Sequence, residues 1–185
     1  MKHELIFAGF GGQGIMSMGK VLSYAAMLEG KHVMFIPAYG SEMRGGTASC
    51  TVIISDRSID APVAPFPSLL VAMNSPSLDR FQPRVRKNGI IIINATILDK
   101  EQERHDVKNI RIPADKIATD LGNEKVSNMV ILGAVLKCTE CVAMDYIMAA
   151  LKKTLPERHH KMLPLNEKAL YKGIEMAEGG VNYYG

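Results

Sequence analysis

Six residues near the amino terminus constrain the fold more than any other part of the chain. The segment Gly9-Phe10-Gly11-Gly12-Gln13-Gly14 follows a short apolar run, Glu4 to Ala8, which predicts a buried strand. From Ile15, apolar residues recur at steps of three and four until Gly30, which predicts an amphipathic helix that ends at this glycine. A glycine-rich turn in this position is typical of an α/β domain.

Strands and helices are predicted to alternate along the rest of the chain. Further strands are expected at His32–Ile36, Thr47–Ile54, Leu69–Met73, Ile90–Ile93 and Asn109–Ile112. Further helices are expected at Pro76–Phe81, Asp115–Leu121, Val126–Lys137, Val142–Leu155 and Glu167–Ala177. The pattern predicts a three-layer α/β fold, with a mostly parallel, Rossmann-like sheet and helices on both faces. Because no helix separates the second strand from the third, one antiparallel strand pair is expected.

Length and composition favour one soluble globular domain. The chain has 185 residues, 47% hydrophobic and 22% charged, and we expect residues 1–178 to form the domain and 179–185 a mobile tail. The net charge of +3 is small and scattered, so no nucleic-acid partner is predicted. The apolar run at the start is too short for a signal sequence or a membrane span, and three cysteines suggest a reducing compartment. A cytoplasmic location without a membrane partner is therefore expected.

The glycine segment has the features of a phosphate-binding turn. We expect Gly9 to make the tight turn, Gly11 and Gly12 to admit a phosphate, and Gly14 to let helix and strand pack closely. The N–H groups of Gln13, Gly14 and Ile15 would then face an anion at the positive end of the helix. The alternative is that the glycines only make a sharp turn between strand and helix.

Two common nucleotide sites fit the sequence poorly. A dinucleotide site normally has an Asp or Glu at the end of the second strand, to bind the ribose. Residues 34–38 read Met-Phe-Ile-Pro-Ala and contain no carboxylate. No Lys-Ser or Lys-Thr follows the glycines, as a P-loop requires. A free-standing dinucleotide-binding reductase remains an alternative because of the glycine pattern itself.

Four loops are predicted to meet beyond the carboxyl ends of the strands, where open α/β sheets bind ligands. They are Gly9–Gly14, Tyr39–Gly46, Asn74–Ser75 and Asn94–Thr96. Arg44 is the one cation among them and suits a phosphate or a partner chain, but a surface ion pair with Glu42 is an equal alternative. Each asparagine, taken singly, is better explained as a turn residue that bonds its own backbone.

The cysteines, histidines and serines of the chain are not predicted to form a metal site or a catalytic site. Cys138 and Cys141 supply two thiolates where a metal cluster usually needs four ligands, so packing at a helix end is favoured. His159 and His160 lie in a charged stretch and receive no role. No serine has an identifiable partner histidine, so no catalytic and no metal-binding residue is assigned.

The combination of two glycine motifs resembles a known family. Tyr39-Gly40-Ser41-Glu42-Met43-Arg44-Gly45-Gly46 is followed by the strand Thr47–Ser55, about thirty residues after Gly9–Gly14. With Asn128-Met129 and Leu132-Gly133-Ala134, this pattern resembles the gamma subunit or gamma domain of 2-oxoacid:ferredoxin oxidoreductases. The resemblance covers most of the chain.

The resemblance implies a noncatalytic subunit of an enzyme that decarboxylates a 2-oxo acid, forms an acyl-coenzyme A and reduces ferredoxin. It implies alpha and beta partner subunits and allows a ferredoxin-like delta subunit, and these partners would hold thiamine diphosphate, Mg²⁺ and iron–sulfur clusters. The 2-oxoglutarate or ketoisovalerate type is preferred over the pyruvate type. A purely structural interface subunit is a further alternative. The candidate residues for coenzyme A or the interface are Gly9, Gly11, Gly12, Gln13, Gly14, Ser41, Glu42, Arg44, Gly45 and Gly46.

Overall fold

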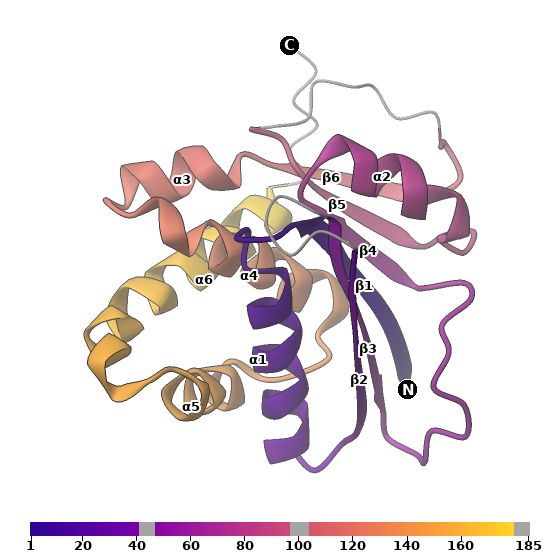
Figure 1. The fold of residues 1–185 in the computed structure, drawn as a ribbon, viewed down its shortest axis with the longest axis horizontal. Helices are drawn as coiled ribbons and strands as arrows, with labels where there is room; N and C mark the ends of the chain where they lie inside the picture. The colour runs from indigo at the N-terminus through magenta and orange to yellow at the C-terminus, as the bar shows by residue number, and fades with distance from the viewer. Residues whose placement is uncertain (41–46, 97–103, 180–185) are drawn as a thin grey trace.

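A mixed sheet of six strands forms the centre of the part of the chain that is described. The computed structural model describes residues 1–40, 47–96 and 104–179 (Figure 1). The strand order is β2-β3-β1-β4-β5-β6. The strands are β1 (Lys2–Phe10), β2 (His32–Tyr39), β3 (Thr47–Ser55), β4 (Leu69–Ala72), β5 (Ile90–Asn94) and β6 (Lys108–Ile112).

Strand β3 runs against the direction of the other strands. The strands β1, β4, β5 and β6 pair in parallel, as predicted. The expected antiparallel pair of the second and third strands is confirmed, and β3 pairs antiparallel with β1 as well. Because β3 returns directly from β2 and then binds β1, it separates β1 from β2 in the sheet. The end of β2 is thus one strand further from the glycine segment than in a sheet where β1 and β2 are neighbours.

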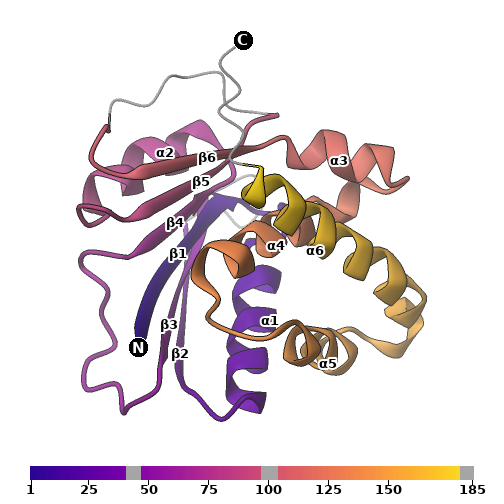
Figure 2. The ribbon, with the colours of Figure 1, turned by 180° about the vertical axis from the view of Figure 1, so that it is seen from behind.

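Helices cover both faces of the sheet, which confirms the predicted three-layer arrangement. Figures 1 and 2 show α1, α4, α5 and α6 gathered on one side of the sheet and α2 on the other. The helices are α1 (Ile15–Leu28), α2 (Ser75–Phe81), α3 (Ala114–Asp120), α4 (Ser127–Thr139), α5 (Met144–Thr154) and α6 (Leu163–Glu178). Three short 3₁₀ segments lie at Gln82–Arg84, Glu124–Val126 and Glu157–Met162.

Each face of the sheet has its own hydrophobic core, because alternate residues of a strand point to opposite sides. Leu5 and Phe7 of β1 belong to the larger core, which includes residues of α1, α4, α5 and α6. Ile6 and Ala8 belong to the smaller core around α2. The predicted strand Ile90–Ile93 is central and buried from Ile91 onward, as its unbroken run of isoleucines indicated.

Helix α4 meets α1 at one of its ends and α6 at the other. Gly14, just before α1, lies against Asn128 in the first turn of α4. At the opposite end, Lys137 of α4 forms an ion pair of 2.7 Å with Glu178 of α6. Helices α4 and α6 cross closely, since a Cβ atom added at Gly173 would lie 2.8 Å from the carbonyl carbon of Val130.

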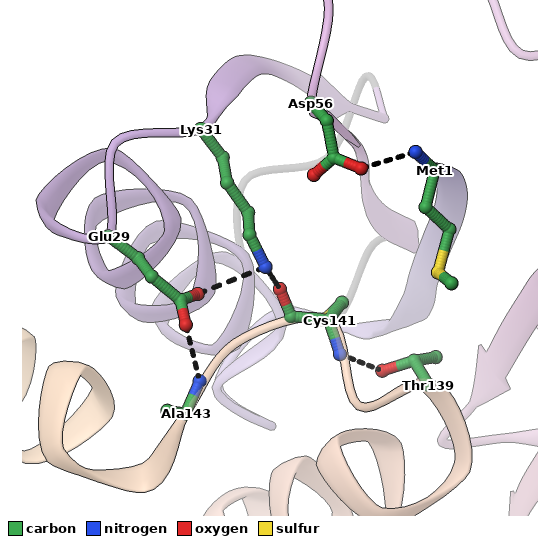
Figure 3. A network of polar contacts seen from close by, with 7 residues as sticks. All are labelled: Met1, Glu29, Lys31, Asp56, Thr139, Cys141 and Ala143. Atoms are coloured by element: carbon green, nitrogen blue, oxygen red, sulfur yellow. Dashed lines mark hydrogen bonds and ion pairs between the residues drawn. The ribbon is translucent and has the colours of Figure 1, made fainter.

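The end of the molecule opposite the glycine segment is held by a small polar network (Figure 3). Lys31, which follows α1, donates to the Cys141 carbonyl and pairs with Glu29 at 3.1 Å. Glu29 also accepts from the Ala143 backbone N–H at 3.3 Å. Cys141 lies in the main core and Cys138 packs against it, so the predicted helix-end packing is confirmed. Burial raises the pKa of both thiols.

Candidate functional site

The turn between β1 and α1 lies later in the sequence than predicted. Gly9 is still part of β1 and pairs with Ala48, so the expectation that it makes the tight turn is wrong. The turn is made by Gly12 and Gly14, whose φ angles are +97° and +75°. Residues with a side chain rarely adopt this left-handed conformation, so glycine is required at these two positions.

The close-packing role expected of Gly14 belongs to Gly9. A Cβ atom at Gly9 would lie 2.8 Å from the Cδ1 atom of Ile15 and 2.9 Å from the Cβ atom of Met73. Real Cβ atoms essentially never come so close to other atoms, so Gly9 lets α1 and β4 approach β1. Gly14 instead leaves room for Asn128 of α4.

Gln13 ties the turn to the neighbouring strand through its side chain. Its Oε1 atom accepts from the Phe10 N–H at 2.7 Å, and its Nε2 atom donates to the Met73 carbonyl at 3.1 Å. The Gln13 N–H donates to the Phe10 carbonyl at 3.3 Å, so the expectation that this group faces an anion is wrong. Gln13 therefore fixes the shape of the turn.

The amino end of α1 has backbone donors that are free of partners in the described residues. Gly14 is the N-cap, and no side chain caps the helix. The first N–H to bond within the helix is that of Met18, which donates to the Gly14 carbonyl at 3.0 Å. The preceding N–H groups, those of Gly14, Ile15, Met16 and Ser17, have no protein acceptor within 1–40, 47–96 and 104–179. Such donors, together with the helix dipole, favour an anion at this position.

These donors lie beside a pocket of about 370 Å³ between α1, the end of β2 and the start of β3. Among the described residues that line it, none is charged, and Tyr39 is 66% exposed. The pocket contains three of the predicted site residues, Gly11, Gly12 and Gly14. The other described lining residues are Phe10, Ile15, Met16, Ser17, Tyr39, Gly40, Thr47 and Ala48.

Half of the predicted site residues lie outside the described part of the chain. These are Ser41, Glu42, Arg44, Gly45 and Gly46. The residues on either side of this segment, Gly40 and Thr47, both line the pocket, and the Gly40 N–H donates to the Thr47 carbonyl at 2.8 Å.

The two asparagines expected at this edge of the sheet serve the backbone. Asn74 is the N-cap of α2 and accepts from the Ser77 N–H at 2.9 Å. Asn94 accepts from the Ala114 N–H at 3.3 Å and donates to Asp115 at 2.8 Å. Neither lines the pocket, so the explanation of each as a residue that bonds nearby backbone is confirmed.

Three residues at the site, Ser17, Thr47 and Asn128, are not among those predicted from the sequence. Ser17 and Thr47 line the pocket with hydroxyl-bearing side chains, and Asn128 contacts the turn from α4. In the sequence, Asn128 stands out only as part of the family pattern. No local signal distinguishes these residues from other polar residues at helix and strand ends, because the fold brings them together.

Cys50 lies below the first turns of α1 and has no ligand-binding features. Its thiol donates weakly to the Ile15 carbonyl at 3.6 Å, and burial raises its pKa to about 12. The thiol is therefore protonated at neutral pH.

No three His, Cys, Asp or Glu side chains gather as a metal site in the residues that the structure describes. Within those residues no helix is both long and apolar enough to span a membrane.

Two relatives give the level of sequence similarity. The chain is 43% identical over 172 residues to the ketoisovalerate oxidoreductase subunit VorA of Methanothermobacter marburgensis, covering 92% of this chain and 35% of VorA. It thus spans about a third of that relative's length. It is 30% identical over 181 residues to the 2-oxoglutarate synthase subunit KorC of Methanocaldococcus jannaschii, covering 96% of this chain and 95% of KorC.

Two solved structures share the fold. The gamma subunit of keto/oxoacid ferredoxin oxidoreductase from Geobacter sulfurreducens has a TM-score of 0.82 and 27% identity, over 96% of this chain and 99% of that one. The 2-oxoglutarate:ferredoxin oxidoreductase from Magnetococcus marinus, with 2-oxoglutarate, coenzyme A and succinyl-CoA bound, has a TM-score of 0.87 over 96% of this chain and 31% of that one. At 21% identity the second similarity concerns the fold alone.

The sequence also matches a family model over almost its whole length. The model describes pyruvate ferredoxin/flavodoxin oxidoreductases, and it matches residues 4–176. With the KorC relative, this match confirms the resemblance that the two glycine motifs indicated. The chain belongs to the pyruvate ferredoxin/flavodoxin oxidoreductase family.

Proposed function

We propose that this chain is the gamma-type subunit of a 2-oxoacid:ferredoxin oxidoreductase and that it binds a phosphate-bearing part of coenzyme A. The observation that carries the proposal is the uncapped amino end of α1, whose free N–H groups adjoin a pocket. Backbone donors at a helix start bind phosphates without a charged side chain. Coenzyme A supplies the thiol that accepts the acyl group, and this chain holds part of the molecule.

The size of the pocket limits which part of coenzyme A it can take. A volume of about 370 Å³ lies near the lower end of the roughly 300–1,000 Å³ typical of small-molecule sites. We therefore propose that it holds one phosphate-bearing portion and that a partner subunit encloses the rest. The same architecture in a Magnetococcus marinus enzyme whose structure contains coenzyme A supports this ligand.

We assign the candidate residues different roles in this site. Gly11 and Gly12 line the pocket and keep it open, and Gln13 holds the turn in place through two hydrogen bonds. Ser41, Glu42, Arg44, Gly45 and Gly46 are proposed to complete the site, because their segment connects two lining residues, Gly40 and Thr47. Arg44 would supply the positive charge that the described lining residues do not provide.

We propose that the remaining cofactors belong to partner subunits. These are thiamine diphosphate with Mg²⁺, which activates the 2-oxo acid, and the iron–sulfur clusters that lead to ferredoxin. Relatives named as subunits of larger enzymes support an assembly with alpha- and beta-type partners. We propose that this assembly is cytoplasmic. VorA and KorC support a substrate of the ketoisovalerate or 2-oxoglutarate type.

The position of β2 weakens the alternative of a free-standing dinucleotide reductase. In dinucleotide sites a carboxylate at the end of the second strand bonds the ribose beside the glycine turn. Here β3 lies between β1 and β2, and β2 ends in Pro37, Ala38 and Tyr39. The end of β2 therefore lies two strands away from β1, and its last residues include no carboxylate that could bind a ribose.

A negative charge in the first turn of α1 would test the proposed site. Ser17 is exposed and lines the pocket, so Ser17→Asp should repel a phosphate while leaving the fold intact. We expect coenzyme A to bind the full chain, assembled with its partner subunits, at least tenfold more weakly, measured by isothermal titration calorimetry. The melting temperature of the isolated chain should stay equal or rise, because acidic residues stabilise a helix start by about 0.3–1 kcal/mol.

Ser17→Asn is the matched control, since it has the size of aspartate without the charge. It should bind coenzyme A within about threefold of the wild type, a difference below 1 kcal/mol. Equal affinity of Ser17→Asp and the wild type would contradict a phosphate at this position. Undetectable binding of coenzyme A by the assembled wild type would instead favour a purely structural subunit, and binding of NADH or NADPH would favour the reductase.

A further inference from the structure

The first turn of α4 brings an additional polar side chain to the amino end of α1. Asn128 is the second residue of α4, is only 9% exposed and lies against Gly14. A Cβ atom at Gly14 would lie 2.8 Å from the Cγ atom of Asn128. The missing side chain at Gly14 thus leaves the space that the Asn128 amide occupies.

The Asn128 amide has no hydrogen-bond partner in the part of the chain that the structure describes. The nearby groups of the turn are already engaged. The Gly14 carbonyl accepts from the Met18 N–H, and both polar atoms of the Gln13 side chain are bonded. The Asn128 amide is not completely enclosed by the described residues, so water or a ligand can reach it. The amide of Asn128 therefore has donor capacity directly beside the free N–H groups of α1.

We infer that Asn128 donates a hydrogen bond from its side-chain amide to the anionic group held at the amino end of α1. This inference rests on the proposed function, and it adds a contact from a second helix more than a hundred residues away in the sequence. An asparagine suits the position because its amide donates to an anion without adding a charge that must be desolvated. An aspartate of the same shape would only accept and would repel the ligand.

The inference predicts a different effect for each substitution of Asn128. Asn128→Leu keeps the side chain's size and removes the donor, so coenzyme A should bind about tenfold more weakly, which corresponds to about 1.4 kcal/mol. Asn128→Asp keeps the shape and should weaken binding by more than tenfold. Asn166→Leu is the matched control, because Asn166 is also a buried asparagine on a helix but belongs to α6 and is not one of the residues that meet Gly14. Its affinity for coenzyme A should stay within twofold of the wild type.

A nuclear magnetic resonance titration of the ¹⁵N-labelled wild-type chain, assembled with its unlabelled partner subunits, needs no variant that could fail to fold. Coenzyme A is added, and the Asn128 side-chain N–H₂ signals are followed together with the backbone N–H signals of Ile15, Met16 and Ser17. We expect all of them to shift with one saturation curve. The Asn166 side-chain signals should not move.

The outcomes separate this inference from the proposed function. If the backbone signals of α1 shift and the Asn128 amide does not, Asn128 is not a ligand contact, and the coenzyme A site stands without it. If Asn128→Leu and Asn166→Leu weaken binding equally, the effect comes from packing and the inference is also overturned. If no signal of α1 shifts, the proposed site itself is wrong, and the inference falls with it.

Discussion

At the scale of single residues, the glycines of the first turn differ in what they do. Gly12 and Gly14 provide backbone conformations that other residues avoid, whereas Gly9 provides space between packed elements. The sequence pattern of a glycine turn does not show which glycine allows an unusual backbone conformation and which allows close packing, because both roles require the same residue type. The division predicts that these glycines will respond differently to the same substitution.

We expect Gly14→Ala to destabilise the protein more than Gly12→Ala. Both residues have positive φ angles, which cost a residue with a Cβ atom about 1–2 kcal/mol. A Cβ atom at Gly12 meets nothing within 4 Å, but one at Gly14 meets the Asn128 side chain. We therefore expect losses of about 1–2 kcal/mol for Gly12→Ala and about 2–4 kcal/mol for Gly14→Ala, measured by urea denaturation.

The double variant Gly14→Ala with Asn128→Ala separates the two causes. Removing the Asn128 amide leaves room for the new methyl group, so the added alanine at position 14 should cost no more than at position 12. If the single variants Gly12→Ala and Gly14→Ala reduce the free energy of unfolding equally, the contact between residue 14 and Asn128 does not contribute to the loss.

At the scale of secondary-structure elements, the contacts of α4 with α1 and with α6 determine where the site forms. The starts of α1 and α4 meet at the carboxyl edge of β1. The close crossing of α4 and α6 depends on glycine on both sides, at Gly133 and Gly173. The position of α4, and therefore of Asn128, depends on this crossing.

Gly173→Ala should destabilise the protein although alanine is the better helix former. Helix propensity alone predicts a gain of about 1 kcal/mol. The new Cβ atom would lie 2.8 Å from the Val130 carbonyl carbon and 3.0 Å from the Ala134 nitrogen. These are backbone atoms of a helix, which cannot move away by a rotamer change as a side chain can. We expect a net loss of about 1–3 kcal/mol in the free energy of unfolding. Lys168→Ala, an exposed change on α6, should stay within about 0.5 kcal/mol of the wild type, and a stabilised Gly173→Ala would contradict the close crossing.

At the scale of the whole molecule, the two cores share one sheet, and we propose that residues 1–178 unfold as one domain. All three thiols are partly or fully withdrawn from water, and burial raises the pKa of each above the usual value of 9.0. In the unfolded chain these thiols lose their protons near that usual value. The folded state then binds more protons than the unfolded state, so stability must fall as the pH rises above 9.

Cys50 should contribute most clearly to this alkaline loss, because its pKa is raised to about 12. We expect the free energy of unfolding of the wild type to decrease between pH 8 and pH 10, with Cys50 adding a slope of up to about 1.4 kcal/mol per pH unit. Urea denaturation at a series of pH values measures this slope. Cys50→Ala should have a shallower slope whatever its absolute stability, and parallel curves for the two proteins would show that Cys50 ionises equally in both states.

Much of the architecture could be read from local patterns. The strand Ile90–Ile93 and the helix Val126–Lys137 were recognisable because a run of isoleucines and an apolar helix repeat arise from neighbouring residues. Helix α6 begins at Leu163 instead of Glu167, because Pro164 fits the first turn of a helix and need not precede it. The second pairing of β3 was missed, because its hairpin with β2 is local and its contact with β1 is not.

The sequence by itself determined the order of strands and helices, the presence of a glycine turn between β1 and α1, and the family resemblance of the two motifs. These properties depend on backbone preferences and on side-chain periodicity over a few residues. Only the tertiary structure decided that Gly9 packs while Gly12 and Gly14 turn, that β3 separates β1 from β2, and that Asn128 meets Gly14. Those outcomes depend on contacts between segments far apart in the chain, which form only when the helices pack on the sheet.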